Sequence, residues 1–262
     1  MAGTSSSSRL YKKLIMSKVK IFTFVFNRPD LLQQQIDCFN KYLQDDFEFN
    51  VVYDTRDDEY LEQFKEICEK NSVNFYHHQS QPGNTPSFYN ADAVQWTYDN
   101  VVCKDDEDYF VLFLDHDIFP IEEFSVNEIM EGYDIAGCTQ RRAHVTYIWQ
   151  GLLFLRKSAV VNEDFDFYPK TVDGQMLDSC GGTYSLLRNP NIRYRATSVE
   201  YPEDYNGINL LDEKNSNGFG FELHLDGKML HSRNASNWHN GLRVTDTNKT
   251  SVLNTILSDF IE

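Results

Sequence analysis

Two aspartates flank one histidine at the point where an apolar stretch of the chain ends. Asp115 and Asp117 follow residues 109–114, which are all aromatic or aliphatic. Because burying a charge costs free energy, a buried strand that ends in paired carboxylates usually presents them to a positive group. Hard divalent cations prefer oxygen ligands, so a metal ion carrying a phosphate is the natural candidate. The alternative is a solvated acidic turn, since acids are common in this chain.

The segment that leads to this triplet alternates between strand and helix patterns. Runs rich in β-branched and aromatic residues predict strands, and apolar residues at helical spacing predict helices. The predicted strands are 19–26, 47–53, 73–76 and 109–114, and the predicted helices span about 29–43, 61–68 and 87–101. Such alternation implies an α/β fold with a mainly parallel sheet flanked by helices.

Several polar segments fall at the carboxyl ends of these strands. Asn27 follows the first strand, Asp54 the second, the loop 77–86 the third, and the acidic triplet the fourth. Ligands of parallel α/β sheets bind beyond these strand ends. We therefore expect the four segments to converge on one crevice.

The regular alternation of predicted strands and helices ends after the triplet. Strands are predicted at 133–138 and 149–155, a short helix from Asp178 through Leu187, and a final helix over 252–260. Asp226-Gly227 predicts a two-residue hairpin turn that sets Leu223 opposite Leu230 and Glu222 opposite His231. The hairpin belongs to a smaller subregion in the second half of the chain.

Composition excludes some partners and suggests a compartment. The 262 residues carry 40 acids against 24 bases, a net charge of −16, which is the wrong sign for a nucleic-acid partner or an anionic membrane surface. The five cysteines form no C-x-x-C pair, which argues for reduced thiols and against a zinc knot. With no visible signal peptide or membrane span, we expect a soluble cytoplasmic protein.

The domain organisation is predicted to be simple. Residues 1–17 are Ser-rich and polar, and we expect a flexible leader or tag, with Met16 as a natural start; a native tail is the alternative. Residues 18–262 would form one catalytic domain, with a nucleotide-binding half over 18–120 and an acceptor-binding half over 121–262.

Taken together, these motifs resemble the GT-A glycosyltransferases, especially those akin to family 2. The matching residues are Val25 to Pro29, Asp54, Gly83-Asn84 with Asn90-Ala91, the D-x-D motif Asp115-His116-Asp117, and the ending His231 to Trp238. The order and spacing of the segment from Gly83 to Ala91 depart from the family pattern. The resemblance covers roughly residues 18–240, and it implies a Rossmann-like GT-A sheet. Compact enzymes of this kind also occur in large DNA viruses of algae.

The resemblance implies a metal site at the triplet. Asp117 would bind the metal directly, Asp115 would contact it through water or contact the ribose, and His231 would be a further ligand. His224 and His239 compete for that last role, and a solvated hairpin histidine is the alternative reading of His231. A histidine ligand in an oxygen-rich site favours Mn²⁺ over Mg²⁺.

The resemblance also implies the donor contacts. Asp54 and the segment from Thr23 through Phe24 to Asn27 would hold the uracil and ribose of a UDP-sugar. Arg28 would reach a phosphate, and Asn90 belongs to the same set.

The acceptor side rests on fewer residues. An inverting transfer needs a general base near the acceptor hydroxyl, and Asp178 is the candidate, with Asp173 as the runner-up. The competing reading is that Asp178 only caps a helix. Trp149 and Gly151 would line the sugar sites, as an apolar platform and a point of close approach, unless they only pack the core.

We therefore predict a glycosyltransferase that uses Mn²⁺ or Mg²⁺ to move a sugar from a nucleotide-sugar donor to a glycan or other hydroxyl acceptor. Three rivals remain. A phosphohydrolase of the haloacid dehalogenase type also uses a D-x-D motif. In that family the motif normally follows the first strand, whereas here three strand–helix units precede it. A nucleotidyltransferase usually has a Gly-rich basic loop, whereas residues 27–30 contain no glycine. The third rival is a non-catalytic carbohydrate-binding domain.

Overall fold

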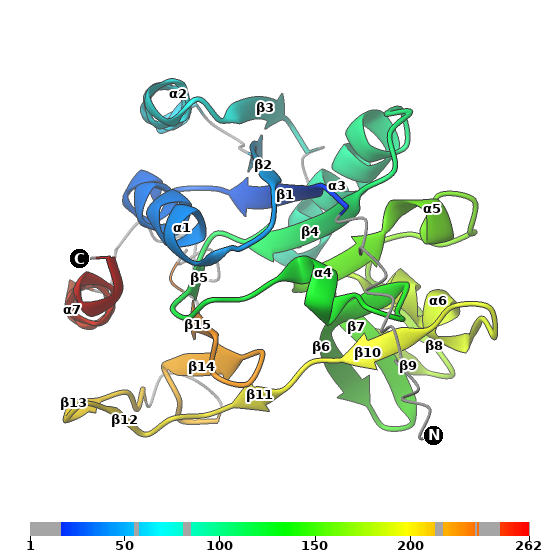
Figure 1. Cartoon of the computed structure of the whole chain (residues 1–262). Helices are drawn as coiled ribbons and strands as arrows, with labels where there is room; N and C mark the ends of the chain where they lie inside the picture. The colour runs from blue at the N-terminus through cyan, green and yellow to red at the C-terminus, as the bar shows by residue number, and fades with distance from the viewer. Residues whose placement is uncertain are drawn as a thin grey trace, which may run out of the picture.

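A seven-stranded sheet forms the centre of the protein (Figure 1), with strand order β10-β6-β7-β4-β1-β2-β3. The structure is a computed structural model, and it describes residues 17–54, 58–80, 85–212, 217–233, 235 and 247–261. The strands are β1 (Val19–Val25), β2 (Phe47–Asp54), β3 (Asn74–His78), β4 (Phe110–Asp115), β6 (Ile135–Arg142), β7 (Val145–Arg156) and β10 (Tyr194–Ala196). Only β7 pairs antiparallel with its neighbours, so the predicted α/β fold with a mainly parallel sheet is confirmed.

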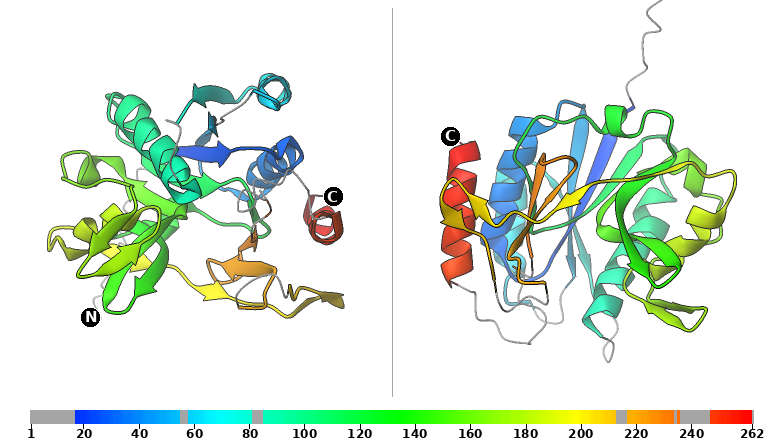
Figure 2. Two further views of the ribbon diagram at one scale, coloured as in Figure 1. Left: turned by 180° about the vertical axis from the view of Figure 1, so that it is seen from behind. Right: turned by 90° about the horizontal axis from the view of Figure 1, so that it is seen from below.

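Helices cover both faces of this sheet (Figure 2). Helices α1 (Pro29–Tyr42) and α2 (Leu61–Asn71) bury residues such as Phe39 and Phe64 against one face. Helix α3 (Pro86–Thr97) and the π-helical turn η1 (Tyr98–Val102) pack on the other face. Pro29 begins α1 because its fixed φ suits the first turn and its missing N–H costs nothing there. The C-terminal helix α7 (Thr247–Ile261) packs beside α1.

A second, four-stranded sheet lies beside the carboxyl end of β4, with order β11-β14-β15-β5. Its strands are β5 (Ile118–Pro120), β11 (Val199–Glu200), β14 (Phe221–His224) and β15 (Met229–Ser232). The hairpin has the predicted register, with Glu222 opposite His231 and Leu223 opposite Leu230. Asp226 and Gly227 both have positive φ, and the Lys228 N–H donates to the Leu225 carbonyl, as a type I′ turn requires.

Short elements fill the second half of the chain. They are the hairpins β8 (Lys170–Val172) with β9 (Gln175–Leu177) and β12 (Asp204–Tyr205) with β13 (Ile208–Asn209), the helices α4 (Val126–Ile129), α5 (Lys157–Val160) and α6 (Tyr184–Arg188), and the 3-10 turn η2 (Gly181–Thr183). The predicted helix from Asp178 begins three residues late, at Gly181, because Cys180 takes a left-handed conformation with φ 64°.

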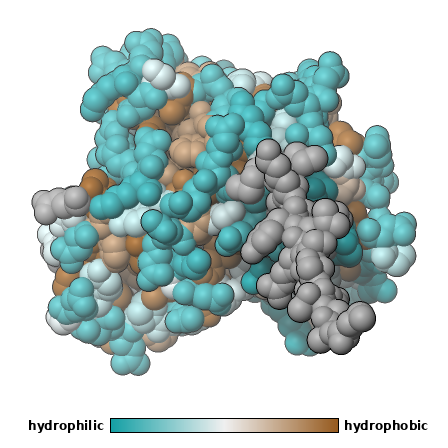
Figure 3. Space-filling model, in the orientation of Figure 1, coloured by the Kyte–Doolittle hydropathy of each residue, from teal (hydrophilic) through white to brown (hydrophobic). Residues whose placement is uncertain are grey.

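Figure 3 shows one face on which hydrophilic side chains predominate. Within the described ranges, no helix combines the length and the apolar character needed to cross a bilayer.

Candidate functional site

One cavity of about 500 Å³ opens where the strands of the large sheet end. Asp54 at the end of β2, Asp115 at the end of β4 and Asp117 just beyond β4 all line it. Its other walls come from α3, from β6 and β7, from residues 178–179, and from the β14–β15 hairpin. Of the four segments expected to converge, Asp54 and the acidic triplet therefore line this cavity, whereas Asn27 and the described residues of the loop 77–86 do not.

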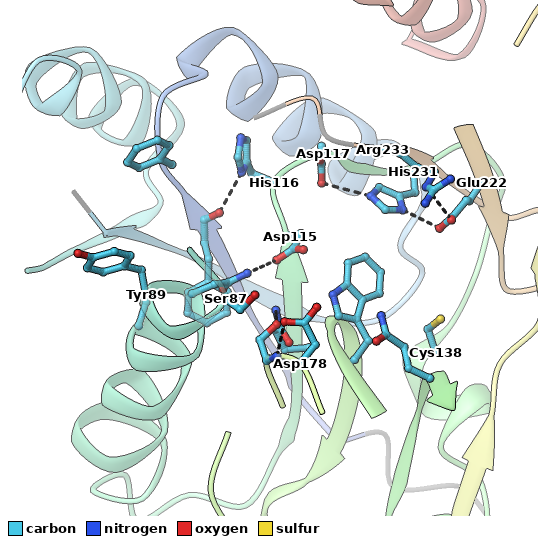
Figure 4. A pocket seen from close by; sticks show the side chains of 18 of the residues that line it. Ser87, Tyr89, Asp115, His116, Asp117, Cys138, Asp178, Glu222, His231 and Arg233 are labelled. Carbon is cyan, nitrogen blue, oxygen red and sulfur yellow. Dashed lines mark hydrogen bonds and ion pairs between the residues drawn. The ribbon is translucent and has the colours of Figure 1, made fainter. Parts of the chain in front are cut away.

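Asp115 and Asp117 form an acidic corner of this cavity (Figure 4). The Asn90 side-chain amide donates to Asp115 Oδ1 at 3.3 Å, and the Ala235 N–H donates to Asp117 Oδ2 at 3.3 Å. Burial and, second, the charge of Asp117 together raise the pKa of Asp115 to about 7. Two carboxylates held this close in a partly dry pocket favour a bound cation.

His116, between the two acids, anchors the triplet to the sheet. Its Nδ1 lies 3.0 Å from the Phe24 carbonyl oxygen on β1, and the ring is buried. Burial lowers the pKa of His116, so the ring is neutral and donates from Nδ1. Because His116 is only 4% exposed and Asp117 only 5%, the reading as a solvated acidic turn is wrong.

His231 reaches this corner from the hairpin. Strand β15 pairs with β5 and sets His231 opposite Ile118, and the Ser232 N–H donates to the Asp117 carbonyl at 2.9 Å. His231 Nε2 consequently lies 3.7 Å from Asp117 Oδ1. The alternative of a solvated hairpin histidine is wrong, because His231 is 7% exposed.

A buried polar cluster surrounds His231. Glu222 Oε2 lies 3.0 Å from His231 Nδ1 and 3.4 Å from His224 Nε2, and Arg233 Nε lies 3.0 Å from Glu222 Oε1. Ligand atoms of Glu222, His224 and His231 all lie within 4.8 Å of one another. Burial opposes the charge on Glu222, but its bonds to the two histidines and the charge of Arg233 hold its pKa well below the ordinary value.

Trp149 covers the two hairpin histidines. Its ring centroid lies 5.2 Å from that of His231 and 6.2 Å from that of His224. Gly151 makes room for this ring, since a Cβ there would come within 2.1 Å of a Trp149 ring atom. Trp149 lines the cavity and Gly151 does not, so Gly151 supports the indole rather than the close approach of a sugar.

Asp54, Phe24 and Asn90 also line the cavity. Asp54 Oδ1 accepts hydrogen bonds from the Ser80 N–H at 3.2 Å and the Ser80 hydroxyl at 2.9 Å. Burial raises the pKa of Asp54, and the two bonds from Ser80 oppose that rise. The free acceptor positions of this carboxylate suit a partner with N–H or O–H groups.

Three expected donor contacts do not line the cavity. Thr23 is fully buried within β1, so its side chain does not reach a ligand. Arg28 pairs with Asp30 at 2.6 Å and donates to the Ala235 carbonyl at 2.9 Å, which commits it to the loop rather than to a phosphate. Asn27 also lies outside the lining.

Asp178 lines the cavity, and Figure 4 shows its side chain directed into it. Its Oδ1 accepts from the Ser179 N–H at 2.8 Å, and its backbone carbonyl accepts from the Gly181 N–H. The helix-capping reading is wrong, because the following turn takes Cys180 as its cap residue. The runner-up Asp173 lies in the β8–β9 turn, exposed, 3.2 Å from His144.

Some residues of the cavity were not singled out from the sequence. Glu222 had a signal, because the hairpin register sets it opposite His231. Arg233 lies in the matching ending His231 to Trp238 but was given no role, and Tyr201 had no signal, since only the pairing of β11 with β14 brings it to the cavity. The competing ligand His239 and the motif residues Gly83 and Asn84 lie outside the described residues.

Neither a family model nor a curated protein matches this sequence. Solved structures do resemble it in part. The mannosyltransferase PcManGT from Pyrobaculum calidifontis, in complex with GDP-Man and Mn²⁺, has a TM-score of 0.47 and 11% identity over 79% of this chain and 60% of that chain. This chain thus spans about 60% of the length of that protein.

Two further structures show the same kind of likeness. TarS of S. aureus has a TM-score of 0.42 and 15% identity over 68% of this chain and 35% of that one. Core-mannan synthase A from Aspergillus fumigatus, in an Mn/GDP form, has a TM-score of 0.38 and 9% identity over 62% and 63%. The organisms named with these structures give no support to a viral link.

Proposed function

We propose that this protein is a metal-dependent glycosyltransferase that moves a sugar from a nucleotide-sugar donor, a UDP-sugar, to a hydroxyl of a glycan acceptor. The observation that carries this proposal is the corner formed by Asp115, Asp117 and His231, which all line the cavity. The same cavity is lined by Asp54, whose carboxylate could accept from a nucleoside, and by Trp149 and Asp178.

The donor set fits a divalent ion. Two ligands that each lie 2.0–2.2 Å from one ion are separated by roughly 3–4 Å, and Asp117 Oδ1 and His231 Nε2 are 3.7 Å apart. The raised pKa of Asp115 is a second sign, because a cation would relieve the repulsion that causes part of it. Mixed carboxylate and imidazole ligands favour Mn²⁺, with Mg²⁺ as the alternative. When bound, the ion would neutralise charge on the departing diphosphate.

The nucleotide would occupy the cavity end near β1 and β2. Asp54 would accept hydrogen bonds from the base or ribose, with Phe24 as an apolar wall and Asn90 held beside Asp115. Thr23, Asn27 and Arg28 do not line the cavity, so they are given no contact with the nucleotide.

The acceptor would enter beside Trp149 and Asp178. The indole face offers a flat apolar surface to sugar C–H groups. The Asp178 carboxylate would accept the proton from the attacking hydroxyl, which makes the transfer inverting. Its remaining oxygen, Oδ2, is the candidate proton acceptor, because Oδ1 already accepts from the Ser179 N–H.

Binding and turnover test the proposal together. Calorimetry with UDP or GDP, with and without Mn²⁺, should show metal-dependent binding. A donor-hydrolysis screen over UDP-glucose, UDP-galactose, UDP-xylose, UDP-N-acetylglucosamine and GDP-sugars identifies the sugar. A protein that binds neither nucleotide in either condition contradicts the proposal, and nucleotide binding without any turnover favours the carbohydrate-binding rival.

Asp117→Ala should abolish metal-dependent turnover, because it removes a carboxylate of the proposed metal site, while the circular dichroism spectrum stays native. Asp173→Ala is the matched control: it makes the same substitution in an exposed turn that lies outside the cavity, and turnover should be unchanged. Wild-type turnover in Asp117→Ala would show that this acid has no catalytic role.

A further inference from the structure

The hairpin that carries His231 also carries a carboxylate bonded to the far side of its ring. Glu222 and His231 are direct cross-strand partners on β14 and β15. Glu222 Oε2 lies 3.0 Å from Nδ1 of the imidazole, while Nε2 on the opposite edge lies 3.7 Å from Asp117 Oδ1. Figure 4 shows these three side chains in a row across the cavity wall.

We propose that Glu222 is a positioning residue: it holds His231 in the tautomer and orientation that present the Nε2 lone pair to the metal site beside Asp117. This inference rests on the proposed function, since it takes the metal site as given. An ionised carboxylate only accepts hydrogen bonds, so Nδ1 must carry the proton and Nε2 is left as the free donor of a lone pair. Partners of this kind fix ligand histidines in metalloproteins and raise their basicity.

The position of Glu222 is itself determined by several contacts. Arg233 Nε holds Oε1 at 3.0 Å, and His224 Nε2 lies 3.4 Å from Oε2. The Glu222 side chain is 11% exposed and that of His224 is not exposed at all, so neither swings freely into water. The carboxylate therefore presents Oε2 to His231 at a fixed place.

The ring plane of His231 is fixed as well. Trp149 lies over it at a centroid distance of 5.2 Å and an interplanar angle of 34°. A flip of the ring would place a carbon against Glu222 and lose the hydrogen bond in a buried site. Trp149 and Glu222 together leave one orientation in which Nε2 faces Asp117.

The same cluster offers a different metal set, made of Glu222, His224 and His231 themselves. Two observations weigh against it. Arg233 already places a positive charge 3.0 Å from Glu222 Oε1. In addition, His231 Nδ1 cannot donate to Glu222 and bind a metal at once, so this set and the site beside Asp117 exclude each other.

Mn²⁺ affinity, measured by electron paramagnetic resonance on the full chain, tests the proposal. Glu222→Gln keeps the shape but removes the charge that selects the tautomer, and we expect about 10–100-fold weaker Mn²⁺ binding. Metal-free uridine binding should be unchanged. Glu200→Gln is the matched control, because it makes the same substitution on the neighbouring strand β11, at an exposed position outside the cavity.

A second measurement needs no variant. Nitrogen-15 chemical shifts of His231 in the wild-type protein, followed to the high pH at which the ring is neutral, should report a proton on Nδ1 and none on Nε2. A neutral ring that carries its proton on Nε2 would overturn the proposal even if Glu222→Gln did not fold.

The outcomes distinguish failure of the proposed metal site from failure of the positioning role of Glu222. A wild-type protein that does not bind Mn²⁺ contradicts the metal site of the proposed function. Wild-type binding that Glu222→Gln leaves unchanged contradicts the positioning role alone. Loss of binding in His224→Gln with full retention in Asp117→Asn would also overturn the proposal, because it would assign the ion to Glu222, His224 and His231.

Discussion

Asp115 lies where the protein accumulates negative charge at a cost in stability. It faces Asp117 in a pocket where burial raises its pKa to about 7, and no basic side chain pairs with it directly among the described residues. Functional sites commonly hold such unfavourable arrangements, which a ligand then relieves. The cost should appear as a dependence of stability on pH in the metal-free protein.

Asp115→Asn should stabilise the metal-free protein by roughly 1–3 kcal/mol at pH 8. The folded pKa of Asp115 is raised to about 7, above its unfolded value of about 3.9, so the wild-type protein loses stability as pH rises between these values. The gain in the variant should therefore be near zero at pH 4, grow up to pH 7 and level off above it. Urea unfolding in EDTA at pH 4, 6 and 8 measures this, and a variant that is less stable at pH 8 contradicts it.

At the scale of elements, the strand–helix alternation before Asp115 could be predicted from the sequence. Apolar residues recur at strand or helix spacing over long stretches, and Pro29 marks the start of the first helix. The hairpin register could also be read, since Asp226-Gly227 demands a type I′ turn. The strands β8 to β13 could not, because each has only two or three residues and presents no period. Their pairing depends on tertiary contacts.

The site shows the same division. The sequence could predict that the two acids and His231 line one cavity, because strand ends and hairpin pairing determine where their backbone lies. Thr23 and Arg28 were misassigned, because a motif does not tell on which side of a strand or loop each side chain lies. Thr23 points into the core of the sheet, and Arg28 turns to Asp30.

Gly151 in strand β7 leaves room for the Trp149 ring, which lies over His231 of the hairpin. Its substitution tests whether the packing of this ring affects metal binding. In Gly151→Ala the new Cβ would lie within 2.1 Å of the Trp149 ring, so the indole must move off His231. We expect a loss of about 1–3 kcal/mol in stability from overpacking and weaker Mn²⁺ binding. Calorimetry and thermal unfolding measure the two effects.

Gly137→Ala is the control for this change. A Cβ there would come within 2.7 Å of Ile148 Cγ2 and the Leu152 carbonyl oxygen, in the same sheet, and no Trp149 atom is among the three atoms nearest to it. It should lose similar stability and keep its Mn²⁺ affinity. Equal metal affinity in both variants would show that the placement of Trp149 does not matter to the site.

At the scale of the whole molecule, charge determines how ligands enter. The chain has a net charge of −16, and five acids line the cavity: Asp54, Asp115, Asp117, Asp178 and Glu222. Of the described residues that line it, Arg233 is the single lysine or arginine, and it pairs with Glu222. A diphosphate therefore meets a negative field unless a cation is bound first.

UDP should bind at least about 100-fold more weakly without Mn²⁺, a difference of about 2.7 kcal/mol, because its phosphates are repelled by the acidic corner. Uridine, which carries no phosphate, should bind equally with and without the ion. Calorimetry of both ligands in EDTA and in Mn²⁺ makes the comparison. Equal metal dependence for the two would place the ion at the nucleoside rather than at the diphosphate.

The seven-stranded and four-stranded sheets each contribute side chains to the proposed metal site. Asp115 ends a strand of the large sheet, and His231 belongs to the small one, joined to it through the short turn before β5. A bound ion would therefore cross-link the two sheets. Amide hydrogen exchange should then slow on β14 and β15 when Mn²⁺ is added and stay constant on β1 and β2, so that loading of the site is reported by a hairpin far along the chain from the acidic triplet.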